Sequence, residues 1–261
     1  MSIKLMMPIT QMKTKELINK ISKKIKENPL LSILILSFVV RVIYLSINWP
    51  LWWDAHVYIG MGKYIFSNGQ IGMWESFRPL IHPIIIGVLW KLNLNPIAWG
   101  KVLDLLFSLI AIFLLYKISE KVFNKKIAIL SSLIFSLTPL FIMHTGLILT
   151  EPLALTFGLL GVYLILDTSN KLNNSNKLDT SNRLNQAKIM RIFFSGLFLG
   201  LAFLTKFTMG IFFAAIFFVL LVKKEKIVTK IKTILALGIG FILPIVPYMA
   251  FNYSRYPNMF E

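Results

Sequence analysis

Long apolar runs, separated by short polar segments, dominate the chain. Seven of them approach the roughly 20 residues that a helix needs to cross a hydrocarbon core about 30 Å thick. The runs cover residues 30–48, 97–116, 127–143, 152–166, 192–205, 207–222 and 233–250. The fifth holds only 14 residues, so it is either a short span or half of a broken helix joined to the sixth across Lys206. The pattern predicts an all-α fold, a polytopic transmembrane helix bundle of about seven spans within residues 30–256.

The loop between the first two spans, residues 49–96, has a different pattern. Apolar side chains recur there at helical spacing, at Val57, Met61, Tyr64 and Ile65. This spacing predicts an amphipathic helix lying in the outer membrane interface. All six tryptophans lie between residues 49 and 99. They form either an interfacial aromatic belt or a platform that stacks on a sugar, and different tryptophans can do each.

Charge and composition indicate how the chain sits in the membrane. Hydrophobic residues make up 56% and charged residues 15%, which excludes a disordered chain and argues against a soluble domain. The net charge is +17, and most cations fall in the inner segments if the N-terminus is cytoplasmic. The excess charge therefore reflects topology, and no nucleic-acid partner is expected. We predict a multi-pass protein of the cell membrane with a cytoplasmic N-terminus and an uncleaved first anchor.

Three segments are expected to carry little chemistry. Residues 1–29 combine lysines with apolar residues at helical spacing, a pattern typical of a helix lying on an anionic leaflet. Residues 167–191 are polar and predict a flexible cytoplasmic loop. Residues 257–261 form a short tail.

Two carboxylates are the first candidates for catalysis, because the chain has no cysteine and most of its acids fall on the cytoplasmic side. Asp54 and Glu151 stand where an outer loop meets a helix, at the depth of a lipid head group. Charges near a membrane tend to be functional or paired. Each also has a local alternative role. Asp54 suits a helix N-cap, and Glu151 suits the dipole of a helix opened by Thr150 and Pro152.

The three histidines, His56, His82 and His144, also map to the outer side. Interfacial hydrogen bonding is their default role. The alternative is a divalent metal site formed by Asp54, His56, His144 and Glu151, although no motif fixes its spacing. No other cofactor is predicted.

Cations on the same side are candidates for binding a phosphate group. Lys63 and Arg78 lie in the first outer loop, and Lys206 interrupts an otherwise apolar stretch. Lys206 either contacts phosphate or snorkels to the interface.

Two further pairs of residues are predicted to stabilise the helix bundle. Arg41 and Asp104 lie at equal depth on adjacent antiparallel spans, which predicts an ion pair. The spacing of Gly196 and Gly200 predicts close helix packing rather than a phosphate loop.

The order of these features resembles the GT-C class of membrane glycosyltransferases, specifically the dolichyl-phosphate-mannose protein mannosyltransferases and their aminoarabinose transferase relatives. The matching features are spread over residues 30 to 256. In the first half of the chain they are Arg41 late in the first span, Asp54 in WWDAHVYIGMGKYIFSNG, and Arg78, Pro79 and Pro83 in RPLIHPIIIGVLWKL. In the second half they are Glu151 in LTEPLALTFGLLGVYLI, the stretch GLFLGLAFLTK ending at Lys206, and PYMAFNY at 247–253. The chain departs from many relatives in having Asp54-Ala55 where they have Asp-Glu. It also stops soon after the seventh run, whereas relatives usually continue for several more spans.

The resemblance implies transfer of a sugar from a polyprenyl-phosphate donor to a protein or glycolipid acceptor on the extracytoplasmic face, with inversion. It implies Asp54 as the base that deprotonates the acceptor and Glu151 as a second acid that orients the acceptor or His56. The implied substrate contacts are His56, Lys63, Arg78, His82 and Lys206. The expected partners are the lipid-linked donor, the acceptor, the bilayer and, as an open alternative, a second chain that supplies further spans.

A competing class is a non-catalytic subunit, or a transporter or flippase of lipid-linked sugars. A transporter is expected to place ionisable groups along a path near the bilayer midplane. Here only Arg41 and Asp104 lie deep within the predicted spans, so the pattern favours chemistry at the outer interface.

Overall fold

The computed structural model describes residues 19–20, 23–24, 26–47, 50–172 and 181–255. Within these residues the chain forms α-helices and a short 3-10 helix, η2, and no strand is present. In chain order the elements are α2 (Pro29–Ser46), α3 (Trp53–Phe66), α4 (Ile81–Lys91), α5 (Pro96–Val122), α6 (Lys125–Leu137), α7 (Pro139–His144), α8 (Glu151–Leu172), α9 (Ser181–Thr205), η2 (Phe207–Met209), α10 (Gly210–Val222) and α11 (Ile227–Arg255). The all-α prediction is confirmed.

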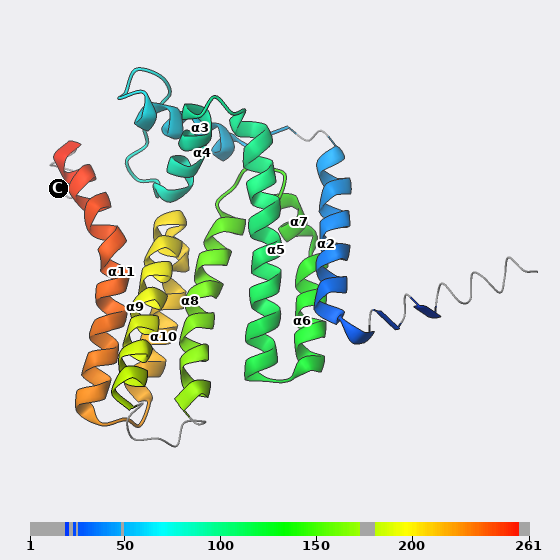
Figure 1. The fold of residues 1–261 in the computed structure, drawn as a ribbon. Helices are drawn as coiled ribbons and strands as arrows, with labels where there is room; N and C mark the ends of the chain where they lie inside the picture. Colours follow the sequence, from blue (N-terminus) through cyan, green and yellow to red (C-terminus); the bar gives the residue numbers. More distant parts are fainter. Residues whose placement is uncertain (1–18, 21–22, 25, 48–49, 173–180, 256–261) are drawn as a thin grey trace, which may run out of the picture.

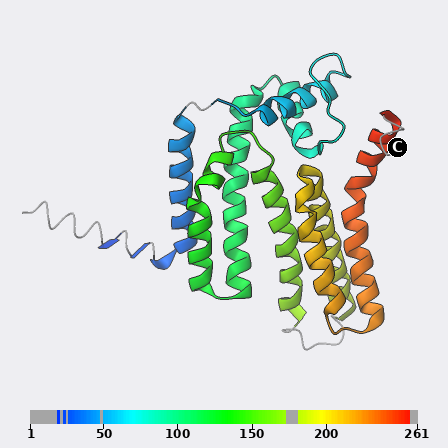
Figure 2. The same cartoon turned by 180° about the vertical axis from the view of Figure 1, so that it is seen from behind.

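The helices form a bundle with a cover at one end. The long helices stand side by side along one direction, and α3 and α4 lie across one end of them (Figures 1 and 2). We call this the α3/α4 end. Helices α5 and α8 begin there, and the chain returns to it at the end of α9. The cover and the helix ends beneath it therefore meet at the same level.

Apolar helices of spanning length make the chain a polytopic helical membrane protein. In the described part of the chain, four segments are long and apolar enough to cross a bilayer: Pro29–Ser46, Pro96–Val122, Gln186–Thr205 and Ile227–Tyr253. Shorter apolar helices cover Ile81–Lys91, Glu151–Leu166 and Phe207–Val222. A helix lies at each of the seven predicted runs, but the third run does not form one continuous helix.

A proline breaks that third run. Helix α6 ends at Leu137, Thr138 has an extended backbone, and α7 begins at Pro139. Proline has no backbone N–H to donate and disfavours helical conformation in the residue before it. Residues 127–143 therefore form two helices, α6 and α7, rather than one continuous helix.

The fifth and sixth runs form two separate helices. Helix α9 extends to 25 residues, longer than its apolar run, because polar residues from Ser181 onward continue it. At Lys206 the backbone is extended, with φ −155° and ψ 115°, and the chain turns into η2 and α10. Helix α10 then runs back alongside α9 (Figure 1). The run before Lys206 is thus a complete helix.

The amphipathic helix predicted within residues 49–96 is α3. Its apolar face buries Val57 and Met61 against Leu80. Helix α3 packs tightly on α4 because Gly62 and Gly87 face each other, and a Cβ on either one would collide with the backbone of the other helix.

The predicted ion pair between Arg41 and Asp104 is wrong. The Arg41 guanidinium instead donates hydrogen bonds to the Ser37 hydroxyl and, at 3.0 Å, to the Ser136 carbonyl, and it lies 5.1 Å from the centre of the Phe141 ring. Asp104 is buried, and its Oδ2 atom has no hydrogen-bond partner in the described part of the chain. Equal depth in the bundle does not set the direction of a side chain around its helix.

The close packing predicted at Gly196 and Gly200 is confirmed. A Cβ on Gly196 would collide with the carbonyl oxygen of Leu237, and one on Gly200 with that of Phe241. From α11, Gly240 approaches the carbonyl oxygen of Phe193 in the same way. Small residues on both helices thus let α9 and α11 approach closely.

Several predicted features fall wholly or partly outside the described residues. These are most of the basic segment 1–29, Trp49, the centre of the predicted loop 167–191 and the tail 257–261. At the edges of that loop the structure differs from the prediction, since α8 continues to Leu172 and α9 begins at Ser181. The division of the chain into segments stays a prediction.

The α9–α11 contact predicts unequal effects of two alanine substitutions on one helix. Gly240→Ala inserts a methyl group against the Phe193 carbonyl and should lower stability by about 1–3 kcal/mol. Gly238→Ala is the matched control, because nothing lies within 4 Å of the added Cβ. It should leave stability unchanged or raise it by up to about 1 kcal/mol. Thermal unfolding in detergent measures both, and equal midpoints for the two variants would contradict the packing.

Candidate active site

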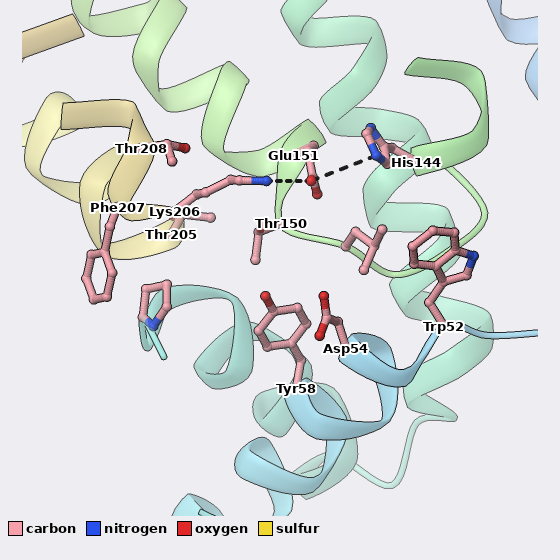
Figure 3. Close-up of a pocket in the computed structure, with 12 residues that line it drawn as sticks. Trp52, Asp54, Tyr58, His144, Thr150, Glu151, Thr205, Lys206, Phe207 and Thr208 are labelled. Carbon is pink, nitrogen blue, oxygen red and sulfur yellow. Dashed lines mark hydrogen bonds and ion pairs between the residues drawn. The ribbon is translucent and has the colours of Figure 1, made fainter. Parts of the chain in front are cut away.

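A cavity of about 400 Å³ lies where the α3/α4 cover meets the ends of the long helices. Its walls come from α3, from the start of α8, and from the turn between α9 and α10 (Figure 3). The lining residues are Trp52, Asp54, Tyr58, Pro79, His144, Leu149, Thr150, Glu151, Thr205, Lys206, Phe207 and Thr208. Segments far apart in the sequence therefore bring acids, a lysine, a histidine and hydroxyl groups to one chamber.

Asp54 reaches the cavity from the first turn of α3. Helix α3 has Trp52 at its N-cap and no side-chain capping hydrogen bond, so Asp54 is not the cap. Its carboxylate lies 2.9 Å from Nη2 of Arg78, and 45% of the side chain stays exposed. An acid in the first turn also interacts favourably with the helix dipole. Asp54 is therefore an accessible carboxylate held by a neighbouring cation.

Arg78 is the residue that holds the Asp54 carboxylate in place. Its guanidinium donates hydrogen bonds to Glu75 and to the Tyr58 hydroxyl and forms an ion pair with Asp54. Burial by itself lowers the pKa of Arg78, but these bonds outweigh burial and raise that pKa above its ordinary value. Arg78 does not line the cavity, since its charge is engaged by two carboxylates. The predicted role of Arg78 as a phosphate contact does not fit this placement.

Glu151 enters the cavity from the first residue of α8, where the T-E-P sequence predicted a helix start. Its Oε1 atom accepts a hydrogen bond from Lys206 Nζ at 2.6 Å. The same oxygen lies 3.8 Å from Nε2 of His144 (Figure 3). Lys206 keeps 35% of its side chain exposed, so its ammonium is both paired and accessible from the cavity.

His144 lies close to the Glu151–Lys206 pair and is neutral. Burial lowers its pKa, Lys206 lowers it further, and Glu151 partly offsets both effects. A neutral imidazole next to an acid can accept or donate one hydrogen bond, which suits it to orient a hydroxyl group.

His82 lies beneath the site and does not line it. It is 3% exposed, and its ring meets the Tyr58 ring edge-on at 5.1 Å. Burial lowers the pKa of His82 to about 4, against a smaller opposing effect of Glu151. The structure therefore makes His82 a support for Tyr58 and offers no direct contact with substrate.

Two other predicted contacts lie away from the cavity. His56 follows Asp54 by two residues, points to a different face of α3 and is exposed. Lys63 lies at the far end of α3 and is not among the lining residues.

The alternative metal set does not assemble. Asp54, His144 and Glu151 line the cavity but His56 does not. No group of three or more His, Asp or Glu side chains with the arrangement of a metal site occurs in the described part of the chain. The four residues therefore do not fit a metal.

The tryptophans divide between the two roles considered for them. Trp52 lines the cavity, whereas Trp53 is 72% exposed at the outside of the cover. Trp74 packs between Tyr64 and Phe251. Trp52 is thus the only described tryptophan placed to stack on a ligand in this cavity.

Several lining residues were not singled out by the sequence. Tyr58 lies one helical turn after Asp54, so helical spacing from Asp54 was the signal that could have found it. Thr205 and Thr208 flank Lys206 in sequence, and this proximity was the only signal they carried, whereas Thr150 had been noted only as part of the helix start at Glu151.

The sequence was compared with known families. Residues 78–251 match the dolichyl-phosphate-mannose-protein mannosyltransferase family. The chain belongs to this family. The match includes Glu151 and Lys206, while Asp54 lies before it. No curated protein sequence matches this member of the family.

Solved structures of an oligosaccharyltransferase from Archaeoglobus fulgidus share the fold. The apo crystal structure has a TM-score of 0.64 at 15% identity, over 87% of this chain and 30% of that chain. The form tethered to an acceptor peptide with the NVT sequon has a TM-score of 0.56 at 13% identity, over 89% and 35%. The enzyme AglB in complex with an inhibitory peptide and a dolichol-phosphate has a TM-score of 0.59 at 13% identity, over 91% and 35%. This mannosyltransferase-family chain thus spans about a third of the length of those chains.

The burial of His82 predicts a pH-dependent stability. The folded state keeps His82 neutral down to a pKa of about 4, whereas the unfolded chain binds a proton below 6.5. Stability should therefore fall as the pH falls from about 6.5 towards 4. His82→Phe keeps an aromatic ring against Tyr58 and should remove about 2 kcal/mol of the loss seen between pH 7.5 and pH 5.

Thermal unfolding in detergent at the two pH values checks this. His56→Phe, at an exposed position on α3, is the control and should keep the wild-type dependence. The same pH dependence in wild type and His82→Phe would show that His82 is not held neutral.

Proposed function

We propose that this member of the family is a membrane glycosyltransferase that moves a sugar from a polyprenyl-phosphate donor to a hydroxyl group of a protein or glycolipid acceptor. The observation that carries the proposal is the convergence of Asp54, Glu151 and Lys206 on one cavity at the end of a membrane helix bundle. The archaeal relative with the same fold has been solved with a dolichol-phosphate and with peptides, which supports a lipid-linked donor and a peptide acceptor.

Asp54 acts as the base. Its exposed carboxylate takes the proton of the acceptor hydroxyl, whose oxygen attacks the anomeric carbon while the bond from that carbon to the phosphate oxygen breaks. A single displacement of this kind inverts the anomeric configuration. Arg78 positions Asp54 through their ion pair and does not contact the donor.

Lys206 stabilises the departing phosphate. Negative charge grows on the phosphate oxygen in the transition state, and a fixed ammonium group in a partly buried site stabilises that charge. Glu151 holds the Lys206 ammonium in place, and together with His144 it offers acceptors for hydroxyl groups of the acceptor or the sugar. The Trp52 ring supplies an apolar face on which a sugar can stack.

The α3/α4 end faces the extracytoplasmic side in this proposal. Lysine-rich segments lie at the other end of the bundle, at Lys125 and Lys126 at the start of α6 and from Lys223 to Lys226 before α11. The positive-inside rule assigns such segments to the cytoplasm. The cavity then lies where a lipid-linked sugar would present its head group.

Replacing the base should abolish transfer while keeping the fold. Asp54→Asn should lower the rate by about 10²–10⁴-fold, because the amide cannot accept the proton. The matched control is Glu75→Gln, which also removes a carboxylate partner of Arg78 but leaves the base, and should lower the rate by less than about tenfold. Transfer of radiolabelled mannose from polyprenyl-phosphate mannose, in membranes containing each variant, measures both.

Glu120→Gln, an acid-to-amide change at the opposite end of the bundle, should behave as wild type. Transfer that survives Asp54→Asn would remove Asp54 from the role of base. If Glu75→Gln lowered the transfer rate as much as Asp54→Asn does, the loss would come from breaking the Arg78 ion-pair network and not from removing a base.

Charge at Lys206 should matter more than its shape. Lys206→Met should lower kcat/KM for the donor by about 10²-fold, and Lys206→Arg should recover part of the loss by restoring a cation. The double variant Lys206→Met with Glu151→Gln removes the stranded carboxylate as well. Recovery of wild-type kcat/KM in the double variant would show that Lys206 serves only to neutralise Glu151.

A further inference from the structure

A second cavity lies between α9 and α11, near the end of the bundle opposite the α3/α4 cover. Both helices begin at that end, and α11 runs from there towards the cover (Figures 1 and 2). The cavity, which we call the α9/α11 pocket, is lined by Lys188, Ile189, Thr229, Lys232 and Thr233. Its volume is about 130 Å³, against about 400 Å³ for the candidate active site. The pocket therefore suits one small polar group rather than a sugar.

The packing of α9 on α11 leaves room for this pocket. Further along the two helices, Gly196 and Gly240 bring the backbones together. At the pocket, the facing positions hold lysines and threonines instead of glycines. Thr229, Lys232 and Thr233 stand at i, i+3 and i+4, so they share one face of α11 and meet Lys188 of α9 across the cavity.

Positive charge around the pocket exceeds negative charge. Glu225 is the only acid in residues 181–255, whereas residues 223–232 hold five lysines. The Glu225 carboxylate lies 3.1 Å from Nζ of Lys188 and 2.9 Å from Nζ of Lys223, so two ammonium groups share one carboxylate. The Lys188 side chain is only 14% exposed, which makes this charge costly unless it is compensated.

Two hydrogen-bond donors at the pocket have no partner in the described part of the chain. Lys232 makes no ion pair there, and the Thr229 hydroxyl makes no hydrogen bond there. Thr233, by contrast, donates its hydroxyl proton to the Lys230 carbonyl at 2.8 Å. The first turn of α11, which includes Thr229, also contributes the positive end of a helix dipole. The complementary ligand is therefore an anion with several acceptor oxygens.

The pocket lies at the level of lipid head groups. Lys188 and Thr229 are each the third residue of a segment able to span a bilayer, Gln186–Thr205 and Ile227–Tyr253. Beside the pocket, Ile231, Leu235 and Ile239 are each more than half exposed at i, i+4 and i+8 on α11. They form an apolar stripe that runs from the level of the pocket into the span. An acyl chain can lie along this stripe while its head group occupies the pocket.

We propose that the α9/α11 pocket binds a phosphate group, held as the head group of an anionic phospholipid. Lys188 and Lys232 supply the positive charge, and the Thr229 hydroxyl donates a hydrogen bond to a phosphate oxygen. Inorganic phosphate shares this chemistry, and the apolar stripe favours the lipid. The proposal goes beyond the proposed function and does not rest on it, because the pocket shares no residue with the candidate active site.

Titration with phosphatidylglycerol, followed by native mass spectrometry of the protein in detergent, tests the proposal. One lipid should bind saturably, with a Kd at least about fivefold lower than that of zwitterionic phosphatidylcholine. Lys232→Gln breaks no ion pair and should raise the Kd for phosphatidylglycerol about fivefold. Lys224→Gln is the matched control. Lys224 is exposed and does not line the pocket, so at physiological salt its loss should change the Kd by less than about twofold.

Thr229→Val separates a built site from a diffuse attraction to the basic end of the bundle. It keeps the shape and charge of the pocket, removes one donor, and should raise the Kd about twofold to tenfold. Equal effects of Lys232→Gln and Lys224→Gln would overturn the proposal, as would equal affinity for the two lipids. Wild-type affinity in the double variant Lys188→Gln with Lys232→Gln would place the lipid elsewhere and have the same consequence.

Inorganic phosphate distinguishes the two sources of the phosphate group. In excess, it should displace phosphatidylglycerol little more than chloride does at equal ionic strength, because the lipid also gains contacts along the apolar stripe. Complete displacement by inorganic phosphate but not by chloride would assign the pocket to a free anion and overturn the assignment to a lipid.

Discussion

The ion pair between Glu151 and Lys206 joins two helix boundaries on which the cavity depends. Glu151 is the first residue of α8, and Lys206 occupies the extended link between α9 and η2. The 2.6 Å contact fixes the start of one helix to the end of another across 55 positions of sequence. In a partly buried site such a contact is stronger than in water, and neither charge can be removed without stranding the other. Two charged residues, Glu151 and Lys206, therefore form the polar wall of the cavity at these helix ends.

A second charged cluster, in the cover, complements the first. Arg78 binds Asp54 and Glu75 and lies 5.3 Å from the centre of the Tyr58 ring. It therefore holds together the charged and aromatic side chains of the cover, as Lys206 pairs with Glu151 at the ends of the long helices. The two cations differ in what they leave free. Arg78 is 17% exposed and engaged by two acids, while Lys206 is 35% exposed and paired with one. In the proposed function, this difference separates the cation that positions the base, Arg78, from the cation that contacts the phosphate group, Lys206.

The membrane setting explains why the polar groups gather at the end of the bundle. Within the bilayer, backbone groups are satisfied inside each helix, and side chains contribute apolar contacts and close packing. Glycines of α9 and α11 let the backbones approach, and Nη1 of Arg41 donates hydrogen bonds to Ser37 and Ser136. Irregular backbone, such as the α7–α8 turn and the link at Lys206, occurs where helices end. Those irregular segments supply Leu149, Thr150 and Lys206 to the walls of the cavity.

The sequence by itself determined the helical architecture, the amphipathic face of α3, the glycine contacts and the family, because hydropathy, helical period and short motifs are local properties of the chain. It also identified Asp54, Glu151 and Lys206 as unusual charges at helix boundaries. Only the tertiary structure decided the partners: Arg78 pairs with Asp54, Arg41 bonds to Ser37 and Ser136 rather than to Asp104, and His56 lies outside the cavity. A partner depends on the direction in which a side chain leaves its helix and on how that helix is rotated in the bundle. That rotation is set by packing among segments far apart in the sequence.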